Sequence, residues 1–398
     1  MTTDASNSPL RLVALICLAE ALGMTGFAAY PAFLPTLKAQ WQASGAAAGF
    51  VGGAFFLGYM LAVPFLSGIT DRIDARRVFA ASGLLGLAGT GGFALLADGI
   101  ISAALFQALA GAGLAGTYMP GLKALTDRIT GPRQPRYIAF YTATFGIGTS
   151  LSLLLGGWLG ALLPWREAIG LMALGPLLAS AVFLLGVRPQ AASHAHHGGW
   201  WPAFGPALAL GQTRRYILGY AAHCWELFGL RSWLVAFIAF AYGLSASTVP
   251  LSATEAAAAI NLLGLPASIL GNEAAGRLGR QRWIVGTMLA AGGLCWLAGF
   301  SAVLGGWLML AALALYFVAV MADSAALTAG LVAATPLGQR GAAMAISSLL
   351  GFGAGFVAPL VFGATLDAAG GGPLAWGLAF ASLSLGGLLW LLGSRDKV

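Results

Sequence analysis

The sequence predicts an all-α membrane protein with twelve transmembrane helices, arranged as two six-helix bundles related by a pseudo-two-fold axis. Three observations support this prediction. The 398 residues are 59% hydrophobic and only 8% charged, with a mean hydropathy of +0.85, whereas about a quarter of the residues are charged in soluble domains. Twelve apolar runs are near or above the roughly 20 residues needed to cross hydrocarbon. The second six runs repeat part of the first six, which indicates an internal duplication.

The apolar runs form two groups of six. The first group covers residues 10–37, 44–67, 78–97, 100–125, 137–163 and 167–187, and its first run is too long for the core of a signal peptide. The stretch 188–214 is polar and contains Gly, Pro and His, which is typical of a linker. The second group covers residues 215–242, 254–275, 283–304, 306–334, 341–366 and 373–393. We therefore expect an N-terminal bundle over 1–190, a cytoplasmic linker over 191–213 and a C-terminal bundle over 214–398.

Lys and Arg are distributed unevenly between the loops. Of the 20, Lys38 and Arg166 lie on one side and Arg231 lies within a run, which leaves 17 (20 − 2 − 1) on the side of the termini and the even-numbered loops. Because cytoplasmic loops are enriched in Lys and Arg, this distribution predicts a multi-pass inner-membrane protein with both termini in the cytoplasm. The same residues account for the net charge of +7, so no nucleic-acid partner is expected.

The two groups of runs align at a nearly constant offset. At 205 residues Arg72 aligns with Arg277 (277 − 72 = 205), and at 206 residues Glu20 aligns with Glu226 (226 − 20 = 206). Parallel repeats of six spans place a solute site near the middle of the bilayer, between the two halves. The repeat therefore favours a transport protein with one half-site in each bundle.

Charged side chains lie deep inside the predicted spans. A charge at the bilayer centre costs about 2.5–3.5 kcal/mol on insertion scales, so such residues normally face the bundle interior or a watery cavity. A carboxyl group in apolar surroundings favours its neutral form and can exchange a proton. The candidates for proton coupling are Glu20, Glu226 and Asp323. The candidates for solute binding are Arg231, His223, Tyr118, Thr25, Ser324 and Asn261.

The two aligned glutamates are expected to differ in role. Glu226 shares its run with Arg231 and His223, and a nearby opposite charge holds a carboxylate ionised. Glu20 has no such neighbour within about a turn of its helix, so it is the residue expected to bind and release the proton. Two alternatives stay open: the carboxylate that pairs with Arg231 is undecided, and His223 is either a proton carrier or a core histidine.

Backbone signals and charge balance add to this picture. Pro120 and Gly121 lie inside the fourth run and are expected to free backbone carbonyls, which is tolerated where a helix lines a cavity.

Three acidic residues face one arginine at mid-depth. The balance favours a cation, a zwitterion or a neutral polar solute over a bare anion.

The loop after the second run reads Ser67-Gly-Ile-Thr-Asp-Arg-Ile-Asp-Ala-Arg-Arg77. With the six-plus-six repeat, this loop resembles the signature loop of the major facilitator superfamily, although Asp74 stands where a Gly is usual. The resemblance implies alternating access and a cytoplasmic gate, in which an acidic helix start and a basic cluster lock and release. The gate residues would be Asp71, Arg72, Arg76 and Arg77 in the first half and Arg277 and Arg282 in the second.

Other motifs depart from individual branches of that family. Gln107 stands where the fourth-span motif has Arg, the fifth run lacks the Gly-Pro of drug/proton exporters, and the signatures of nitrate porters are absent. The runs Thr117-Tyr-Met-Pro-Gly-Leu-Lys123, Cys224-Trp-Glu226 and Ala322-Asp-Ser324 resemble bacterial members loosely grouped near the cyanate/nitrate-type porters. This resemblance does not indicate which solute is transported.

These observations predict a secondary active transporter that moves a small polar solute by alternating access and couples it to protons. The alternatives are an exporter of drugs or metabolites and a transporter-like sensor; import against export, and symport against antiport, stay open. An enzyme is not expected, because the spans hold neither a nucleophile–base set nor a metal cluster. We expect no cofactor, no metal site and a monomer. The histidine tract His194-Ala-His-His197 is expected to be a solvated linker and not a metal site.

Overall fold

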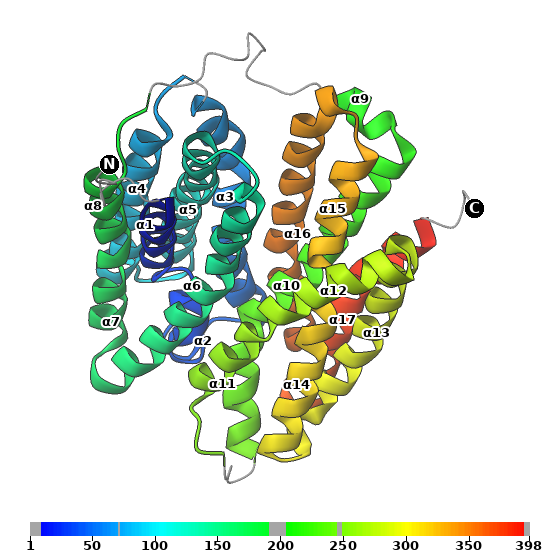
Figure 1. Ribbon diagram of the computed structural model, residues 1–398. Coiled ribbons are helices and arrows are strands. Elements are labelled where there is room, and N and C mark those ends of the chain that lie inside the picture. The colour runs from blue at the N-terminus through cyan, green and yellow to red at the C-terminus, as the bar shows by residue number, and fades with distance from the viewer. Residues whose placement is uncertain (1–8, 71, 191–203, 245–248, 394–398) are drawn as a thin grey trace. The chain divides into compact units, whose positions relative to one another are not determined.

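A computed structural model describes residues 9–70, 72–190, 204–244 and 249–393 (Figure 1). Every regular element in these ranges is a helix. The first half contains α1 (Pro9–Gly23), α2 (Ala29–Gln40), α3 (Gly45–Ile69), α4 (Ala75–Leu96), α5 (Ile100–Arg128), α6 (Gln134–Leu162), α7 (Trp165–Met172) and α8 (Leu174–Gly186). The second half contains α9 (Phe204–Ala209), α10 (Gly211–Leu244), α11 (Ala253–Leu262), α12 (Gly264–Leu278), α13 (Arg280–Phe300), α14 (Gly306–Met321), α15 (Ser324–Ala334), α16 (Arg340–Ala368) and α17 (Gly372–Gly393).

The predicted spans agree with the observed helices. Within the described ranges, 11 helical segments are long and apolar enough to cross a membrane, and they correspond to the second to twelfth predicted runs. The first predicted run, residues 10–37, forms the two shorter helices α1 and α2. The all-α fold class with twelve spans is therefore confirmed.

Part of the predicted linker is helical: α9 covers residues 204–209, and α10 begins at Gly211. Ala207 of α9 packs into an apolar cluster with Ile217 and Leu331. Thr213 of α10 donates its hydroxyl to the carbonyl of Ala334 at 3.1 Å. Packing of this kind stabilises short helical segments despite the local Gly and Pro residues, and the linker itself remains a prediction.

The contacts of the chain divide it into two compact units. One holds Met1–Tyr30 with Gly58–Trp200, and the other holds Pro31–Leu57 with Trp201–Val398. The helix α3 therefore contributes residues 45–57 to the second unit and residues 58–69 to the first. The two-bundle division at residues 190 and 214 remains a prediction, and the grouping of α3 could not be inferred from apolar runs.

Residues 45–57 of α3 belong to the second unit because their backbone lies directly against the backbone of α16. A Cβ atom added to any of three glycines, four residues apart on one face of α3, would overlap a carbonyl of α16. Larger side chains would push the two helices apart, so glycine is required for this approach. The pairs are Gly45 with Gly363, Gly49 with Pro359 and Gly53 with Phe356.

A carboxylate fixes the start of α3 on the same surface. Asp367 Oδ1 accepts a hydrogen bond from the backbone N–H of Gly45 at 2.6 Å, and Oδ2 accepts one from Ala46 at 2.8 Å. The first N–H groups of a helix have no partner inside the helix and carry partial positive charge. Asp367 therefore satisfies two of them with one negative charge.

Four predicted spans are interrupted in the described structure. The first breaks at Met24–Ala28, the sixth at Ala173, the eighth at Leu263 and the tenth at Ala322–Asp323. The fourth span, in contrast, continues as one helix through Pro120 and Gly121. The close packing of α5 on α4 supports the helix on both sides of the proline, so the loss of one N–H does not break it.

Candidate functional site

The first cluster of polar groups surrounds Glu20, in the last turn of α1. The Glu20 side chain is completely buried. The phenolic oxygen of Tyr141, from α6, lies 3.1 Å from Glu20 Oε2 and 2.7 Å from the carbonyl oxygen of Tyr118 in α5. The rings of Tyr118 and Tyr141 stack with centroids 5.5 Å apart. Glu20 and Tyr118, both predicted site residues, are therefore joined through a tyrosine that the sequence analysis did not select.

The helix break after Glu20 is held together by hydroxyl groups. Thr25 Oγ1 donates to the carbonyl oxygen of Met172 at 2.7 Å, and Ser152 Oγ donates to the carbonyl oxygen of Thr25 at 2.5 Å. Ser152 Oγ also accepts from the N–H of Ala28 at 2.9 Å. Thr25 was predicted as a solute contact, but in this structure its hydroxyl binds backbone oxygen and stabilises the break. Unpaired backbone groups inside a membrane cost several kcal/mol each, which explains these bonds.

The second cluster lies in α10 and the tenth span. Glu226 Oε1 accepts a hydrogen bond from the Tyr316 hydroxyl of α14 at 2.9 Å. His223 Nδ1 lies 2.7 Å from Asp323 Oδ1, and both side chains are almost fully buried. At this separation two lone pairs would repel, so one of the two atoms carries a proton. Asp323, which the sequence left as a possible partner of Arg231, therefore lies against His223.

Asp323 sits at the junction between α14 and α15, and Ser324 is the first residue of α15. The break exposes the carbonyl of Ala322, which accepts a hydrogen bond from Trp283 Nε1 at 2.9 Å. Ser324 is half-buried beside this junction. The interrupted helix thus places a buried carboxyl group beside His223, and the Ala322 carbonyl at the break keeps a hydrogen-bond donor.

Arg231 and Asn261 form a third polar contact within the same unit. Arg231 Nε donates to Asn261 Oδ1 at 2.9 Å, and Asn261 Nδ2 donates to the carbonyl oxygen of Ala257 at 3.0 Å. The guanidinium carbon of Arg231 lies 5.7 Å from the centroid of the Phe317 ring. Two residues predicted as solute contacts are therefore brought together, and the amide fixes one edge of the guanidinium.

The two clusters are related by the repeat, but their partners differ. The positions of His223 and Asp323 correspond to Cys17 (17 + 206 = 223) and Tyr118 (118 + 205 = 323) in the first half. Tyr141 corresponds to Ile346 (141 + 205 = 346), so it has no counterpart in the second half. The glutamate positions are thus shared, whereas the hydroxyl donors come from the fifth span in one half and the tenth in the other.

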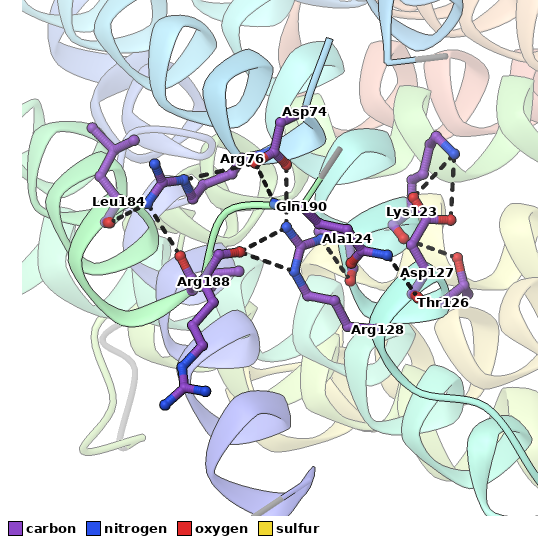
Figure 2. A network of polar contacts seen from close by, with 11 residues as sticks. Asp74, Arg76, Lys123, Ala124, Thr126, Asp127, Arg128, Leu184, Arg188 and Gln190 are labelled. Carbon is purple, nitrogen blue, oxygen red and sulfur yellow. Dashed lines mark hydrogen bonds and ion pairs between the residues drawn. The ribbon is translucent and has the colours of Figure 1, made fainter. Parts of the chain in front are cut away.

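The predicted gate region contains a network centred on Asp74 (Figure 2). Asp74 caps α4 and accepts hydrogen bonds from the backbone N–H of Arg76 at 3.0 Å and of Gln190 at 3.0 Å, and from Arg128 Nη2 at 3.1 Å. Partial burial raises the pKa of Asp74, but these bonds and the Arg128 charge outweigh it and lower the pKa overall. In the sequence Asp74 stands out only as a departure from the family pattern, and its capping role depends on the fold.

The described arginines of the predicted gate differ in their surroundings. Arg76 Nη1 donates to the carbonyl oxygen of Leu184 at 2.8 Å, so its guanidinium is bound at the end of α8 in the same unit (Figure 2). Asp71 lies outside the described residues. Four further arginines of the predicted gate have exposed side chains: Arg72, Arg77, Arg277 and Arg282.

No group of three or more His, Cys, Asp or Glu side chains in the described ranges is placed to hold a metal ion. The histidine tract, residues 194–197, lies outside those ranges.

The fold is similar to solved transporters. A bacterial homologue of the human lysosomal transporter Spinster, in an inward-facing and unoccupied conformation, is 17% identical, with a TM-score of 0.75 over 98% of this chain and 95% of that one. The inward-facing and occupied conformation gives 17% identity and a TM-score of 0.77 over 98% of both chains. No curated protein matches the chain. The model of the Major Facilitator Superfamily matches residues 16–359, and the chain therefore belongs to this superfamily of membrane transporters and is not an enzyme.

Proposed function

We propose that this protein is a secondary active transporter that moves a small polar solute by alternating access and couples the movement to protons. Family membership supplies the transport class. The proton coupling is our inference from the three buried carboxyl groups. Each lies beside a group able to donate or accept a proton: Glu20 beside Tyr141, Glu226 beside Tyr316, and Asp323 beside His223.

The main support for proton coupling is the burial of Glu20 and the incomplete hydrogen bonding of its carboxyl group. The side chain is completely buried, and Oε1 has no hydrogen-bond donor in the part of the chain that the structure describes. An ionised carboxylate here would leave half of its charge unsatisfied, which is far more costly than a neutral acid. The surroundings therefore support a neutral Glu20 in this conformation, which must lose its proton when the site opens to water.

The charge balance supports a class of solute. The contact between His223 and Asp323 satisfies one acidic group within the protein. Once Glu20 has released its proton, Glu20 and Glu226 remain against Arg231, and this excess of negative charge favours a cation, a zwitterion or a neutral polar molecule over a bare anion. Arg231, held by Asn261, would bind any anionic group of a zwitterion or hold a carboxylate ionised.

The remaining expectations form part of the same proposal. The distribution of Lys and Arg supports an inner-membrane protein with both termini in the cytoplasm. The monomeric state remains a prediction. The cytoplasmic gate would consist of Asp71, Arg72, Arg76, Arg77, Arg277 and Arg282. Kinship with the cyanate/nitrate-type porters remains a prediction, as do the exporter and sensor alternatives.

Uptake into vesicles tests this function. Purified protein in proteoliposomes of known orientation is given a pH gradient and a panel of radiolabelled organic cations, amino acids and sugars. At least one member should accumulate above its equilibrium level, and a protonophore should remove the accumulation while leaving exchange between the two sides. Exchange without accumulation under any gradient would contradict proton coupling, and neither exchange nor accumulation would favour the sensor.

A further inference from the structure

We propose that Tyr141 is a positioning residue that converts the protonation state of Glu20 into a change of attachment between helices. The inference rests on the proposed function, because it requires Glu20 to exchange a proton. The three helices concerned, α1, α5 and α6, pack against one another in the first unit (Figure 1).

The Tyr141 hydroxyl has a single hydrogen to donate. Two acceptor positions face the phenolic oxygen: the Tyr118 carbonyl oxygen at 2.7 Å and Glu20 Oε2 at 3.1 Å. A backbone carbonyl can only accept, whereas a carboxyl group accepts when ionised and also donates when neutral. One hydrogen cannot make two full bonds, so the protonation state of Glu20 decides where the Tyr141 hydrogen points.

The two states differ by one proton and one hydrogen bond. When Glu20 is neutral, its O–H donates to the Tyr141 oxygen and the Tyr141 O–H donates to the Tyr118 carbonyl, so a continuous chain joins α1, α6 and α5. When Glu20 loses its proton to water, the carboxylate attracts the Tyr141 hydrogen, and the Tyr118 carbonyl loses this donor. A bond to a charged acceptor is about twice as strong as a neutral one, which drives the exchange. The shorter distance to Tyr118 fits the neutral state.

The sequence of α5 makes room for this arrangement. A Cβ atom on Gly121 would overlap the Tyr141 phenolic oxygen, so only glycine allows the hydroxyl to reach the helix backbone here. The Tyr141 ring is fully buried and stacks on the Tyr118 ring, which leaves rotation of the hydroxyl hydrogen as the cheap movement. The glycine beside the proline thus serves the hydroxyl contact and not a helix break.

The surroundings of Glu20 contain few competing groups. The titratable side chains that face Glu20 are Cys17 on its own helix, Tyr59 of α3, Tyr118 and Tyr141. The helix α8, which also packs on α1, has no titratable side chain. A change at Glu20 is therefore passed to the nearest hydroxyl, and that hydroxyl belongs to Tyr141.

The second half does not reproduce the switch. The Tyr316 hydroxyl donates to Glu226 at 2.9 Å, and within the described ranges it has no second acceptor. Ile346 occupies the repeat position of Tyr141. The device is therefore confined to the first half, and Tyr316 provides a control of the same chemistry without the second acceptor.

Isotope-edited infrared spectroscopy tests the switch in the full-length protein in lipid. Tyrosine labelled with ¹³C at the backbone carbonyl separates the amide band of the nine tyrosines, and spectra at low and high pH are subtracted. The parent should show a neutral carboxyl band that disappears on titration, together with a shift of a labelled carbonyl band. Glu20→Gln should lose the carboxyl band and hold the carbonyl band at its low-pH position, because the amide N–H keeps donating to Tyr141.

Two variants separate the switch from general damage. Tyr141→Phe and Gly121→Ala should both lose the carbonyl shift and hold the band at its high-pH position, and Gly121→Ala does so with both site side chains intact. The Glu20 carboxyl band should still titrate in Gly121→Ala. Tyr316→Phe and Tyr137→Phe, the latter one turn earlier on α6, should keep the full shift.

The outcomes distinguish this inference from the proposed function. A carboxyl band that titrates without any carbonyl shift, or a shift that persists in Tyr141→Phe, overturns the switch and leaves proton exchange at Glu20 standing. A parent protein in which no carboxyl band depends on Glu20 overturns both. A complete switch in a protein that never accumulates solute under a pH gradient overturns the proposed function alone.

Discussion

The carboxylate of Asp367 offers a prediction whose size follows from the structure. It accepts two backbone N–H groups at the start of α3, at 2.6 and 2.8 Å. Replacement by Asn keeps one acceptor oxygen but removes the second acceptor and the negative charge. Losing one hydrogen bond costs about 0.5–1.5 kcal/mol, and losing a charge at a helix start costs about 0.3–1 kcal/mol. The Asp367→Asn variant should therefore weaken this cap by roughly 1–2 kcal/mol.

Hydrogen exchange followed by mass spectrometry measures this effect locally. Because about 1.4 kcal/mol corresponds to a factor of ten, peptides that contain Gly45 and Ala46 should exchange about 5–30-fold faster in the variant. The matched control is Asp127→Asn, which removes an exposed pair with Lys123 at 3.1 Å and should change exchange little anywhere, because such pairs contribute about 0–1 kcal/mol. Equal exchange at residues 45–46 in Asp367→Asn and the parent would show that the cap does not stabilise α3.

Three further predictions follow from the other contacts. Glu226→Gln should reduce both pH-driven uptake and exchange of the same solute, since it alters the acceptor of Tyr316 and the charge balance around Arg231. Failure in the driven assay alone would instead indicate that Glu226 carries the proton. The pKa of Asp74 is lowered in the folded protein, so its contribution to stability is complete above the ordinary aspartate pKa of about 4 and is lost as pH falls through the folded value. Asp74→Asn should therefore lower the Tm near pH 7, and the Tm values of parent and variant should converge in acid. An unchanged difference in Tm at low pH would contradict this. Gly49→Ala places a methyl group against the Pro359 carbonyl and should lower the Tm, whereas Gly68→Ala, which meets nothing within 4 Å, should not; equal Tm values would contradict the close approach.

Hydropathy alone located the spans, because the requirement for about 20 apolar residues is a property of the bilayer and leaves its mark on each run. The division of the first run into α1 and α2 was not predicted, since Thr25 is the only polar side chain in Met24–Ala28 and its bond to Met172 and the bond of Ser152 to the Thr25 carbonyl depend on neighbouring helices. At Pro120 the strongest local signal for a break pointed to the wrong place. A local signal such as proline predicts a helix break only where packing against neighbouring helices does not stabilise the helix.

The candidate site was predictable in part for a related reason. A buried Glu or Asp stands out in an apolar run, so Glu20, Glu226 and Asp323 could be selected from the sequence alone. Their partners could not, because a tyrosine inside a span looks like any other aromatic residue until the neighbouring helix is known. Tyr141 lies in the fifth span and Tyr316 in the tenth, and these spans are not equivalent in the internal repeat. The repeat therefore did not indicate either tyrosine. The pairing of His223 with Asp323 likewise depends on the packing of α10 against the tenth span.

The most direct test of the central claim is paired measurement of driven uptake and exchange for the Glu20→Gln variant. Glutamine mimics the neutral acid, so the account predicts that a pH gradient no longer concentrates a solute carried by the parent, while exchange of that solute between the two sides of the vesicle is retained. Glu167→Gln, the same change at an exposed position of α7, should retain both activities. Continued accumulation by Glu20→Gln under a pH gradient would contradict the account, because the proton would then be carried elsewhere.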